Sequence, residues 1–175
     1  MRARKISGRL EAMASFVSDG EKIADIGADH GYLSFYLIRE GISPFAILTD
    51  VRKGPLEKTR LSAEKASAIS AGIDTKIELR LGDGLYALEK AEVDAVVIAG
   101  MGSETIISIL SADPEKTGSF NKFILQPRTK TELLKEWLER EGWSIFTETS
   151  AEERGRMCDI IVCAPTKKAS EEEYD

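Results

Sequence analysis

The sequence predicts one α/β domain built on an open, mostly parallel β-sheet with helices on both faces. Three observations carry this prediction. The chain has 175 residues, which suits a single domain of ordinary size. Short apolar segments and helical segments alternate five times, and this order requires parallel strands joined by right-handed crossovers. Two further strand-like segments close the chain, so we expect a seven-stranded sheet that ends in an antiparallel hairpin.

The expected strands are apolar, except that residues 76–81 alternate apolar and polar side chains, and each strand is followed by residues that interrupt strands. They are residues 22–26, 45–49, 76–81, 93–99 and 123–125. The expected helices are marked by apolar residues at helical spacing and by capping residues, namely Ser7 before the first helix, Gly41 and Gly72 after later ones, and Pro55 at a first turn. The first expected helix begins after Ser7, and the others cover 32–39, about 55–70, 104–110 and 132–141. Residues 144–149 and 157–164 flank a polar turn at 152–156, which is typical of a hairpin.

The composition excludes several classes of protein. Hydrophobic residues make up 42% and charged residues 31%, which is globular rather than disordered. No apolar run approaches the roughly 20 residues of a membrane span, and the N-terminus lacks the apolar stretch of a secretory signal. Cys158 and Cys163 have an odd spacing in one expected strand and so cannot bridge each other. We therefore expect a cytoplasmic protein, and no metal site, because one histidine and two such cysteines cannot assemble a zinc shell.

The net charge of −6 argues against indiscriminate binding to nucleic acid. A local basic cluster nevertheless precedes the first acidic residue; it consists of Arg2, Arg4, Lys5 and Arg9. These cations either contact phosphates or form a solvated tail. At the other end, residues 166–175 are charged and are expected to form a tail beyond a domain of residues 1–165.

Glycines and polar residues follow all five expected parallel strands. In such a sheet, ligands bind beyond the carboxyl ends of the strands. The residues at these ends are Asp25 to Gly31, Asp50 with Val51, Gly82-Asp83-Gly84, Ala99-Gly100-Met101-Gly102 and Gln126-Pro127-Arg128. Five such loops along one edge predict a ligand pocket.

The first loop indicates the charge of that ligand. It lacks the G-x-G-x-x-G pattern of a dinucleotide site and carries Asp25 and Asp29, which would repel phosphate. A cationic ligand without phosphate fits better, and S-adenosylmethionine is one. Asp50 could then accept hydrogen bonds from its ribose, and Asp83 from its adenine amine. Turn capping is the alternative role for these last two carboxylates, and tight-turn geometry is the alternative for the glycines.

Five motifs carry a resemblance to a known family. They are ISGRL at 6–10, ADIGADHGYL at 24–33, GDGL at 82–85, IAGMG at 98–102 and ILQP at 124–127. Together they resemble the bacterial tRNA (adenine-22-N1)-methyltransferases, which are Rossmann-type, S-adenosylmethionine-dependent enzymes of the class I fold. The resemblance spans about residues 6–164 and implies this fold, this cofactor and a tRNA substrate. The family usually adds a helical C-terminal extension, which we expect to be either absent or removed here; this affects the expected tRNA affinity more than the cofactor pocket.

The resemblance and the loop positions together assign candidate roles. The expected cofactor-binding residues are Asp25, Gly27, His30, Gly31, Tyr32, Asp50, Val51, Gly82, Asp83, Gly84, Ala99 and Gly100. The expected substrate-binding residues are Arg9, Tyr86, Met101, Gly102, Gln126, Pro127 and Arg128. Gly100 and Gly102 would leave room for a flat base or serve only a strand-to-helix turn. The aromatic rings of Tyr32 and Tyr86 would stack on a base or belong to the core.

The predicted chemistry follows from the target atom. The [D/N]-P-P-[Y/F/W] motif of enzymes that methylate exocyclic amines is absent at 99–102. Ring N1 of adenine has an in-plane lone pair, so its attack requires no prior loss of a proton. Positive charge develops on the ring, and a carboxylate would stabilise it. Asp29 is the candidate catalytic residue, with capping of the helix at 32–39 as its alternative role; His30 is either catalytic or a structural hydrogen-bonding residue.

Other functions stay open at this point. The same fold could methylate another substrate or another base position, or it could bind the cofactor without activity. A nicotinamide dehydrogenase is disfavoured by the acidic first loop.

N1 of adenine lies on the Watson–Crick edge, so the target base must be unpaired. We expect a monomer with tRNA and a small-molecule cofactor as its partners.

Overall fold

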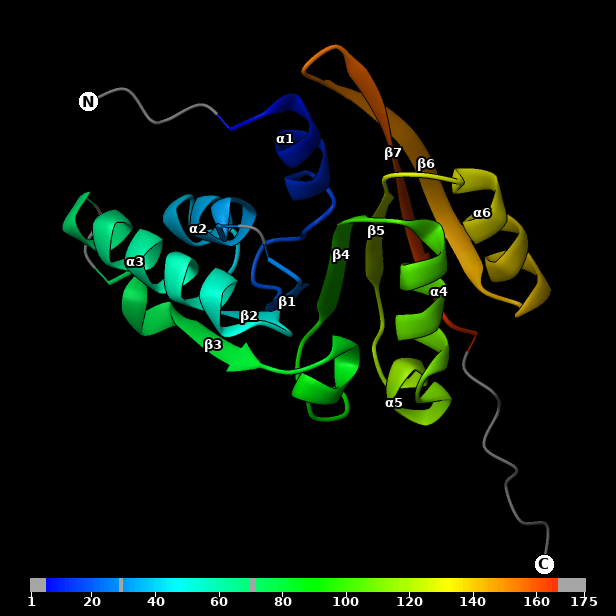
Figure 1. Ribbon diagram of the computed structural model, residues 1–175, viewed down its shortest axis with the longest axis horizontal. Helices are drawn as coiled ribbons and strands as arrows, with labels where there is room; N and C mark the ends of the chain where they lie inside the picture. The colour runs from blue at the N-terminus through cyan, green and yellow to red at the C-terminus, as the bar shows by residue number, and fades with distance from the viewer. Residues whose placement is uncertain (1–5, 29, 70–71, 167–175) are drawn as a thin grey trace, which may run out of the picture.

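The computed structural model describes residues 6–28, 30–69 and 72–166. Its strands form one seven-stranded sheet in the order β3-β2-β1-β4-β5-β7-β6 (Figure 1). Their bounds are β1 Ile23–Ile26, β2 Ala46–Asp50, β3 Ile77–Leu81, β4 Ala95–Met101, β5 Phe123–Pro127, β6 Ser144–Glu153 and β7 Arg156–Ala164. Only β7 runs against its neighbours, because it pairs antiparallel with both β5 and β6. The predicted sheet and closing hairpin are confirmed.

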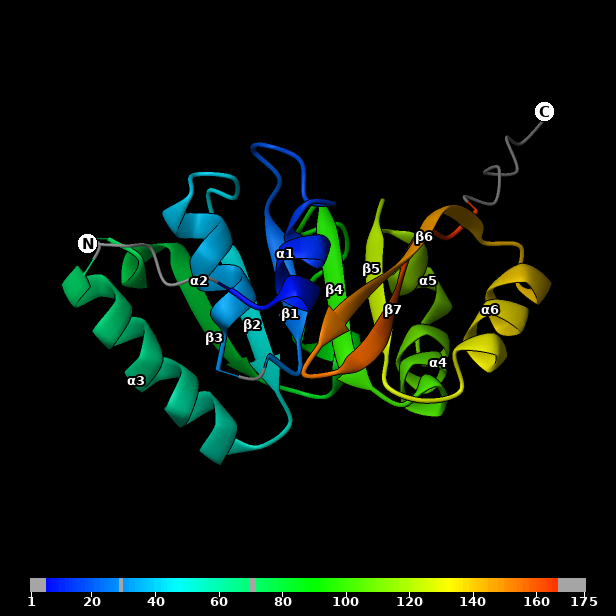
Figure 2. The ribbon, with the colours of Figure 1, turned by 90° about the horizontal axis from the view of Figure 1, so that it is seen from above.

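Helices cover both faces of the sheet (Figure 2). One face is covered by α1 (Gly8–Ala14), α2 (Tyr32–Arg39) and α3 (Lys53–Ile69), and the short η1 (Asp74–Lys76) leads into β3. The other face is covered by η2 (Gly84–Ala87), α4 (Ser103–Ser111), α5 (Pro114–Gly118) and α6 (Thr131–Arg140). Two apolar cores result. Strand β4 supplies Ala95 and Val97 to the first core and Val96 and Ile98 to the second, as expected of a strand buried on both faces.

Local capping signals account for several element ends. The Ser7 hydroxyl accepts a hydrogen bond from the Leu10 N–H at 3.3 Å, which caps α1 as predicted. Gly41 follows α2 in the left-handed conformation, with φ of 72°. The hairpin turns at Arg154 and Gly155, which both have positive φ. This two-residue turn is tighter than the predicted one and matches the twist of the flanking strands.

Two further features differ from the sequence prediction. Strand β4 continues to Met101 instead of ending at residue 99, because a bulge lets pairing with β5 resume at Pro127. The short helix α5 was not predicted, although its signals are present in the sequence. The Asp113 carboxylate accepts the Lys116 N–H at 3.0 Å, and Pro114 occupies the first turn.

Three further observations bear on the expectations from composition. Cys158 and Cys163 both lie on β7 as free thiols. Among the described helices, none has the length and hydropathy needed to cross a membrane. Arg2, Arg4, Lys5 and nearly all of the expected C-terminal tail lie outside the described residues.

Two glycines flanking α2 allow backbone strain to be separated from steric crowding. Gly31 and Gly41 have nearly equal φ values, 68° and 72°. A Cβ on Gly31 would lie 2.7 Å from Leu48 Cδ2 and 2.8 Å from Phe35 Cζ, whereas a Cβ on Gly41 would meet nothing within 4 Å. We expect Gly41→Ala to lower the free energy of unfolding by about 1 kcal/mol, and Gly31→Ala by roughly 2–4 kcal/mol. Urea unfolding measures both, and equal losses would contradict the crowding argument.

Candidate functional site

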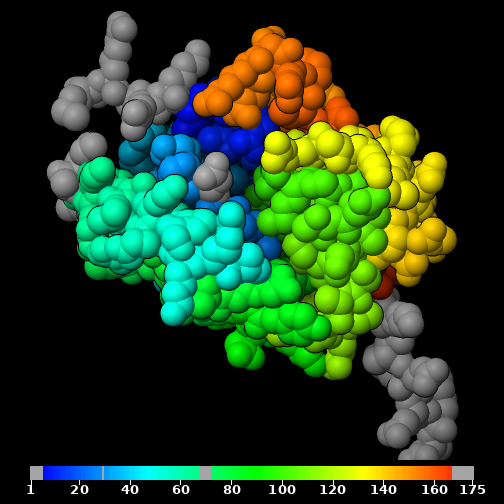
Figure 3. Space-filling model, viewed as in Figure 1, coloured from blue at the N-terminus to red at the C-terminus, as the bar shows by residue number. Residues whose placement is uncertain are grey.

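The site is assembled by the pairing of β1 with a parallel strand on each side. In register, Ile26 of β1 lies beside Thr49 of β2 and Ile98 of β4. The turns that follow these three strands therefore emerge together at one edge of the sheet. Figure 3 looks onto this edge: the cyan chain after β2 and the green chain after β4 lie on either side of the blue residues that follow β1.

The turn after β1 contains several residues in the left-handed backbone conformation. The N–H groups of Gly27 and Ala28 both donate to the Thr49 carbonyl oxygen, at 2.9 and 3.2 Å. Gly27, His30 and Gly31 have φ values of 70°, 59° and 68°, which turn the chain sharply into α2. Turn geometry is thus one confirmed role of the two glycines.

The candidate catalytic residue, Asp29, lies outside the described residues. The N-cap of α2 is Gly31, and the alternative capping role of Asp29 lies outside the described residues, as the residue itself does. The His30 ring stacks on Tyr32, with centroids 5.4 Å apart and planes 20° apart. Tyr32 is half exposed, so its alternative assignment to the core is wrong.

The three described carboxylates at this edge differ in their surroundings. Asp25 is buried and accepts a hydrogen bond from the Ser34 hydroxyl at 3.3 Å. Asp50 is 9% exposed, and its Oδ1 accepts the Arg52 N–H at 2.9 Å, while Arg52 Nε lies at 3.7 Å. Its Oδ2 has no hydrogen-bond partner in the part of the chain that the structure describes. Asp83 is exposed, and its side chain does not cap η2, so its alternative capping role is wrong.

The turn after β3 packs closely against the second layer of helices. A Cβ on Gly82 would lie 2.7 Å from Ala87 Cβ, and one on Gly84 would lie 3.0 Å from Ile109 Cγ2. A shallow pocket is present between η2 and the end of α4. It is lined by Asp83, Gly84, Leu85, Tyr86, Ser108, Ile109, Ala112 and Asp113.

Tyr86 is exposed, so it is not a core residue, and its side chain contacts the end of α4 and the start of α5. Its hydroxyl donates to the Ala112 carbonyl oxygen at 3.3 Å, and the Lys116 ammonium lies 5.7 Å from its ring centroid. The structure therefore places this predicted substrate contact against the α4–α5 connection.

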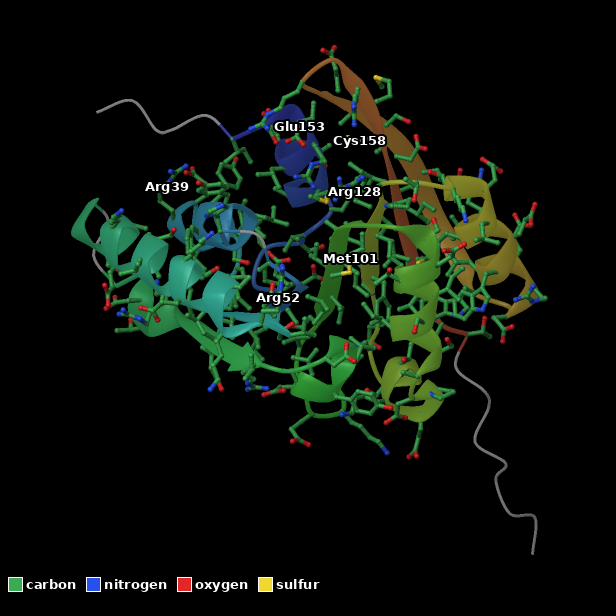
Figure 4. All side chains as sticks on the ribbon, viewed as in Figure 1. Arg39, Arg52, Met101, Arg128, Glu153 and Cys158 are labelled. Atoms are coloured by element: carbon green, nitrogen blue, oxygen red, sulfur yellow. The ribbon has the colours of Figure 1, made fainter. Side chains whose placement is uncertain are left out.

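The end of β4 contains a bulge at Gly100. Ala99 pairs with Gln126 and Met101 pairs with Pro127, so Gly100 is the extra residue, and its φ is 73°. The bulge changes the face on which the next side chain lies: Ala99 packs against the first core and Met101 against the second. Met101 lies over the turn after β1, since a Cβ on Gly27 would be 2.3 Å from Met101 Cε. In Figure 4, Met101 lies between Arg52 and Arg128.

A buried side chain holds the bulge. Gln126 is 3% exposed, and its Oε1 accepts hydrogen bonds from the Gly100 N–H at 3.1 Å and from Arg9 Nη1 at 3.0 Å. Its Nε2 donates to the Pro127 carbonyl oxygen at 2.8 Å. Arg9 also donates from Nε to Glu153 Oε2 at 2.8 Å. Sequence analysis missed Glu153, because 144 residues separate it from its partner and no local pattern marks the contact.

The remaining predicted residues lie around this edge. Val51 is exposed directly after Asp50. Gly102 is the N-cap of α4, and Pro127 is buried in β5. Arg128 is exposed; its N–H donates to the Met101 carbonyl oxygen at 2.8 Å, and its guanidinium has no ion-pair partner among the described residues. No group of three His, Cys, Asp or Glu residues within the described ranges could hold a metal ion.

The Glu153 carboxylate makes the stability of this arrangement depend on pH. Burial acts to raise its pKa, but the Ser7 hydrogen bond and the Arg9 guanidinium outweigh it and lower the pKa below the ordinary 4.5. A lowered pKa in the folded state stabilises the protein above that ordinary value, and this stabilisation is lost as the pH falls through the folded-state pKa. We expect Glu153→Gln to reduce the free energy of unfolding at pH 7 and to match the wild type in acid. Urea unfolding from pH 7 to 3 tests this, with Glu139→Gln as control because Glu139 is exposed on α6; a pH-independent difference would contradict it.

Comparison with known proteins agrees with this architecture. A family model described as a methyltransferase domain matches residues 6–161. The tRNA (adenine(22)-N(1))-methyltransferase of Bacillus subtilis is 35% identical over 162 residues, which cover 93% of this chain and 66% of that protein. The chain thus spans about two thirds of the length of this curated relative.

Two solved structures are similar over nearly the whole chain. A Streptococcus pneumoniae protein in complex with S-adenosyl-L-methionine has a TM-score of 0.83 and 36% identity, over 94% of this chain and 75% of that one. M. capricolum TrmK in complex with S-adenosyl-homocysteine has a TM-score of 0.80 and 29% identity, over 94% and 70%. The chain belongs to the methyltransferase-domain family, in the group that contains the tRNA (adenine-22-N1)-methyltransferases.

Proposed function

We propose that this protein transfers a methyl group from S-adenosylmethionine to N1 of adenine 22 in tRNA, acting as a monomer in the cytoplasm. The observation that carries this proposal is the nearly buried carboxylate of Asp50, whose Oδ2 has no partner among the described residues, beside the turn after β1. The names of the similar proteins support the substrate, and their bound ligands support the cofactor.

The residues present fit the cofactor. Asp50 offers a fixed carboxylate that can accept ribose hydroxyls, and Val51 exposes an apolar surface next to it. Asp83 presents an exposed carboxylate for an exocyclic amine. Gly100 has open space in front of it, because a Cβ there would meet nothing within 4 Å. When bound, S-adenosylmethionine supplies an electrophilic methyl group on a sulfonium centre.

The protein residues would orient the target base and stabilise its charge. The Watson–Crick edge must be free, so the base enters unpaired at the β4 end, near Met101 and Gly102. Nucleophile and methyl carbon react when they are aligned, and the rigid strand ends supply that alignment. Positive charge then develops on the adenine ring and its amine, and the carboxylate of Asp29 is the group we assign to stabilise it.

The surface near the strand ends suits a polyanion in spite of the acidic net charge. Arg128 is exposed, and its guanidinium has no counter-charge among the described residues. Arg52 is also exposed, with 76% of its side chain accessible, and its contact with Asp50 is long at 3.7 Å. Figure 4 shows these two cations on either side of Met101. They can contact phosphates around the entering base.

Replacing Asp50 tests the cofactor site. We expect Asp50→Asn to weaken S-adenosylmethionine binding by about 10- to 100-fold, because hydrogen bonds to a charged acceptor are lost. Titration calorimetry measures the dissociation constant. Asp94→Asn is the matched control, since Asp94 precedes β4 at the opposite edge of the sheet, and within the described residues its carboxylate accepts only the Lys22 N–H. Equal effects of the two substitutions would contradict the assignment.

Replacing Asp29 tests the reaction itself. Unmodified tRNA is incubated with the protein and labelled S-adenosylmethionine, and the nucleosides are then analysed; 1-methyladenosine is the expected product. We expect Asp29→Asn to lower kcat by roughly 100-fold while cofactor binding is retained. Product at another position would replace the proposed substrate, and unchanged turnover in Asp29→Asn would remove its catalytic role.

A further inference from the structure

We propose that Gln126 and Arg9 are positioning residues for methyl transfer: together they hold the Gly100 bulge that directs Met101 over the turn after β1. This inference rests on the proposed function, but its first measurement does not depend on any activity. It assigns an internal role to two residues that the sequence analysis predicted as substrate contacts.

The orientation of the Gln126 amide is determined by its three partners. Two donors, the Gly100 N–H and Arg9 Nη1, converge on Oε1, and one acceptor, the Pro127 carbonyl oxygen, faces Nε2. A flipped amide would place the NH₂ group against two donors and the oxygen against a carbonyl. Because Gln126 is 3% exposed, water cannot compensate for such a mismatch. Arg9 therefore keeps the acceptor end of Gln126 directed at the bulge.

The bulge determines which face of the sheet Met101 occupies. In an uninterrupted strand, Ala99 and Met101 would lie on the same face. With Gly100 as the extra residue they lie on opposite faces, and Met101 reaches Gly27. The Gly100 N–H bonds to a side chain, so the bulge depends on Gln126 for this partner.

Arg9 connects the bulge to the outer part of the fold. Its Nε donates to Glu153 near the hairpin turn, and α1 packs directly on that hairpin. A Cβ on Gly8 would lie 2.9 Å from the Glu152 carbonyl oxygen, which shows how closely the two elements approach. The Arg9 side chain is 20% exposed, and two of its three guanidinium nitrogens donate to protein groups, so the side chain is directed inward.

Amide hydrogen exchange of Gly100, measured by NMR on the unliganded protein, tests the first link. We expect exchange at Gly100 to accelerate about tenfold in both Gln126→Met and Arg9→Met. The amide of Val97, inside the same strand, reports global unfolding and separates a local effect from a general loss of stability. Arg39→Met is the matched control, since Arg39 at the end of α2 pairs with its neighbour Glu40, and Figure 4 shows it well apart from Met101. Unchanged exchange at Gly100 in the first two variants would overturn the proposal, whatever their activity.

Steady-state kinetics with tRNA test the second link. We expect each of the two variants to lower kcat about tenfold with KM for tRNA within twofold, and the double variant to lose no more than the worse single one, because both act through one hydrogen bond. Arg9→Lys should behave like Arg9→Met, since one ammonium cannot replace the two donors of the guanidinium fork. A raised KM with a shallower salt dependence in Arg9→Met, restored by Arg9→Lys, would instead make Arg9 a phosphate contact. If the wild-type protein were inactive on tRNA, the proposed function would be refuted. The effect of the two substitutions on amide exchange at Gly100 would still show whether Gln126 and Arg9 hold the bulge.

Discussion

The parallel pairing of β1 with β2 on one side and β4 on the other is the constraint on which the rest of the molecule depends. Both faces of these strands are covered by helices, so most of their side chains are apolar, and their polar residues lie toward the carboxyl ends, with Asp25 in β1 and Asp50 in β2. Parallel direction places all those ends at one edge. Asp50 therefore lies beside the turn after β1 although the two are distant in sequence. The pairing of the strands in the sheet brings the residues of the site together.

Several residues with unusual backbone conformations lie at this same edge. Gly27, His30, Gly31 and Gly100 all have positive φ, and each belongs to a turn or bulge that the surrounding hydrogen bonds hold in place. Such conformations cost free energy and persist only where neighbouring structure stabilises them. Here the two cores and the Gln126 side chain supply that stabilisation. The result is a rim held by hydrogen bonds and packing, which suits the proposed reaction, whose catalysis would consist mainly of alignment and charge stabilisation.

Much of the fold, and the edge of the sheet at which the candidate site lies, could be predicted from local sequence patterns. Apolar runs followed by glycine or aspartate located four of the parallel strands, and Gln126-Pro127 marked the end of the fifth. Ser7 and Gly41 marked helix ends that the structure confirms. The edge at which the ligand site lies followed from the strand list. The predictions failed where a long-range contact overrides a local signal: Gly100 marked an end of β4 by its composition, yet pairing resumes beyond it because Pro127 lies opposite Met101.

The amino-acid sequence by itself determined the α/β class, the order of the elements and the residue types at the strand ends, because these follow from periodicity and turn chemistry within a few neighbouring residues. The hydrogen-bond partners of those residues follow only from the way the chain packs in three dimensions. This packing turned Arg9 inward to Gln126 and Glu153, set Tyr86 against Ala112, and left one oxygen of Asp50 without a partner among the described residues. Such choices depend on groups that are distant in sequence and are brought together by packing, so no local pattern records them.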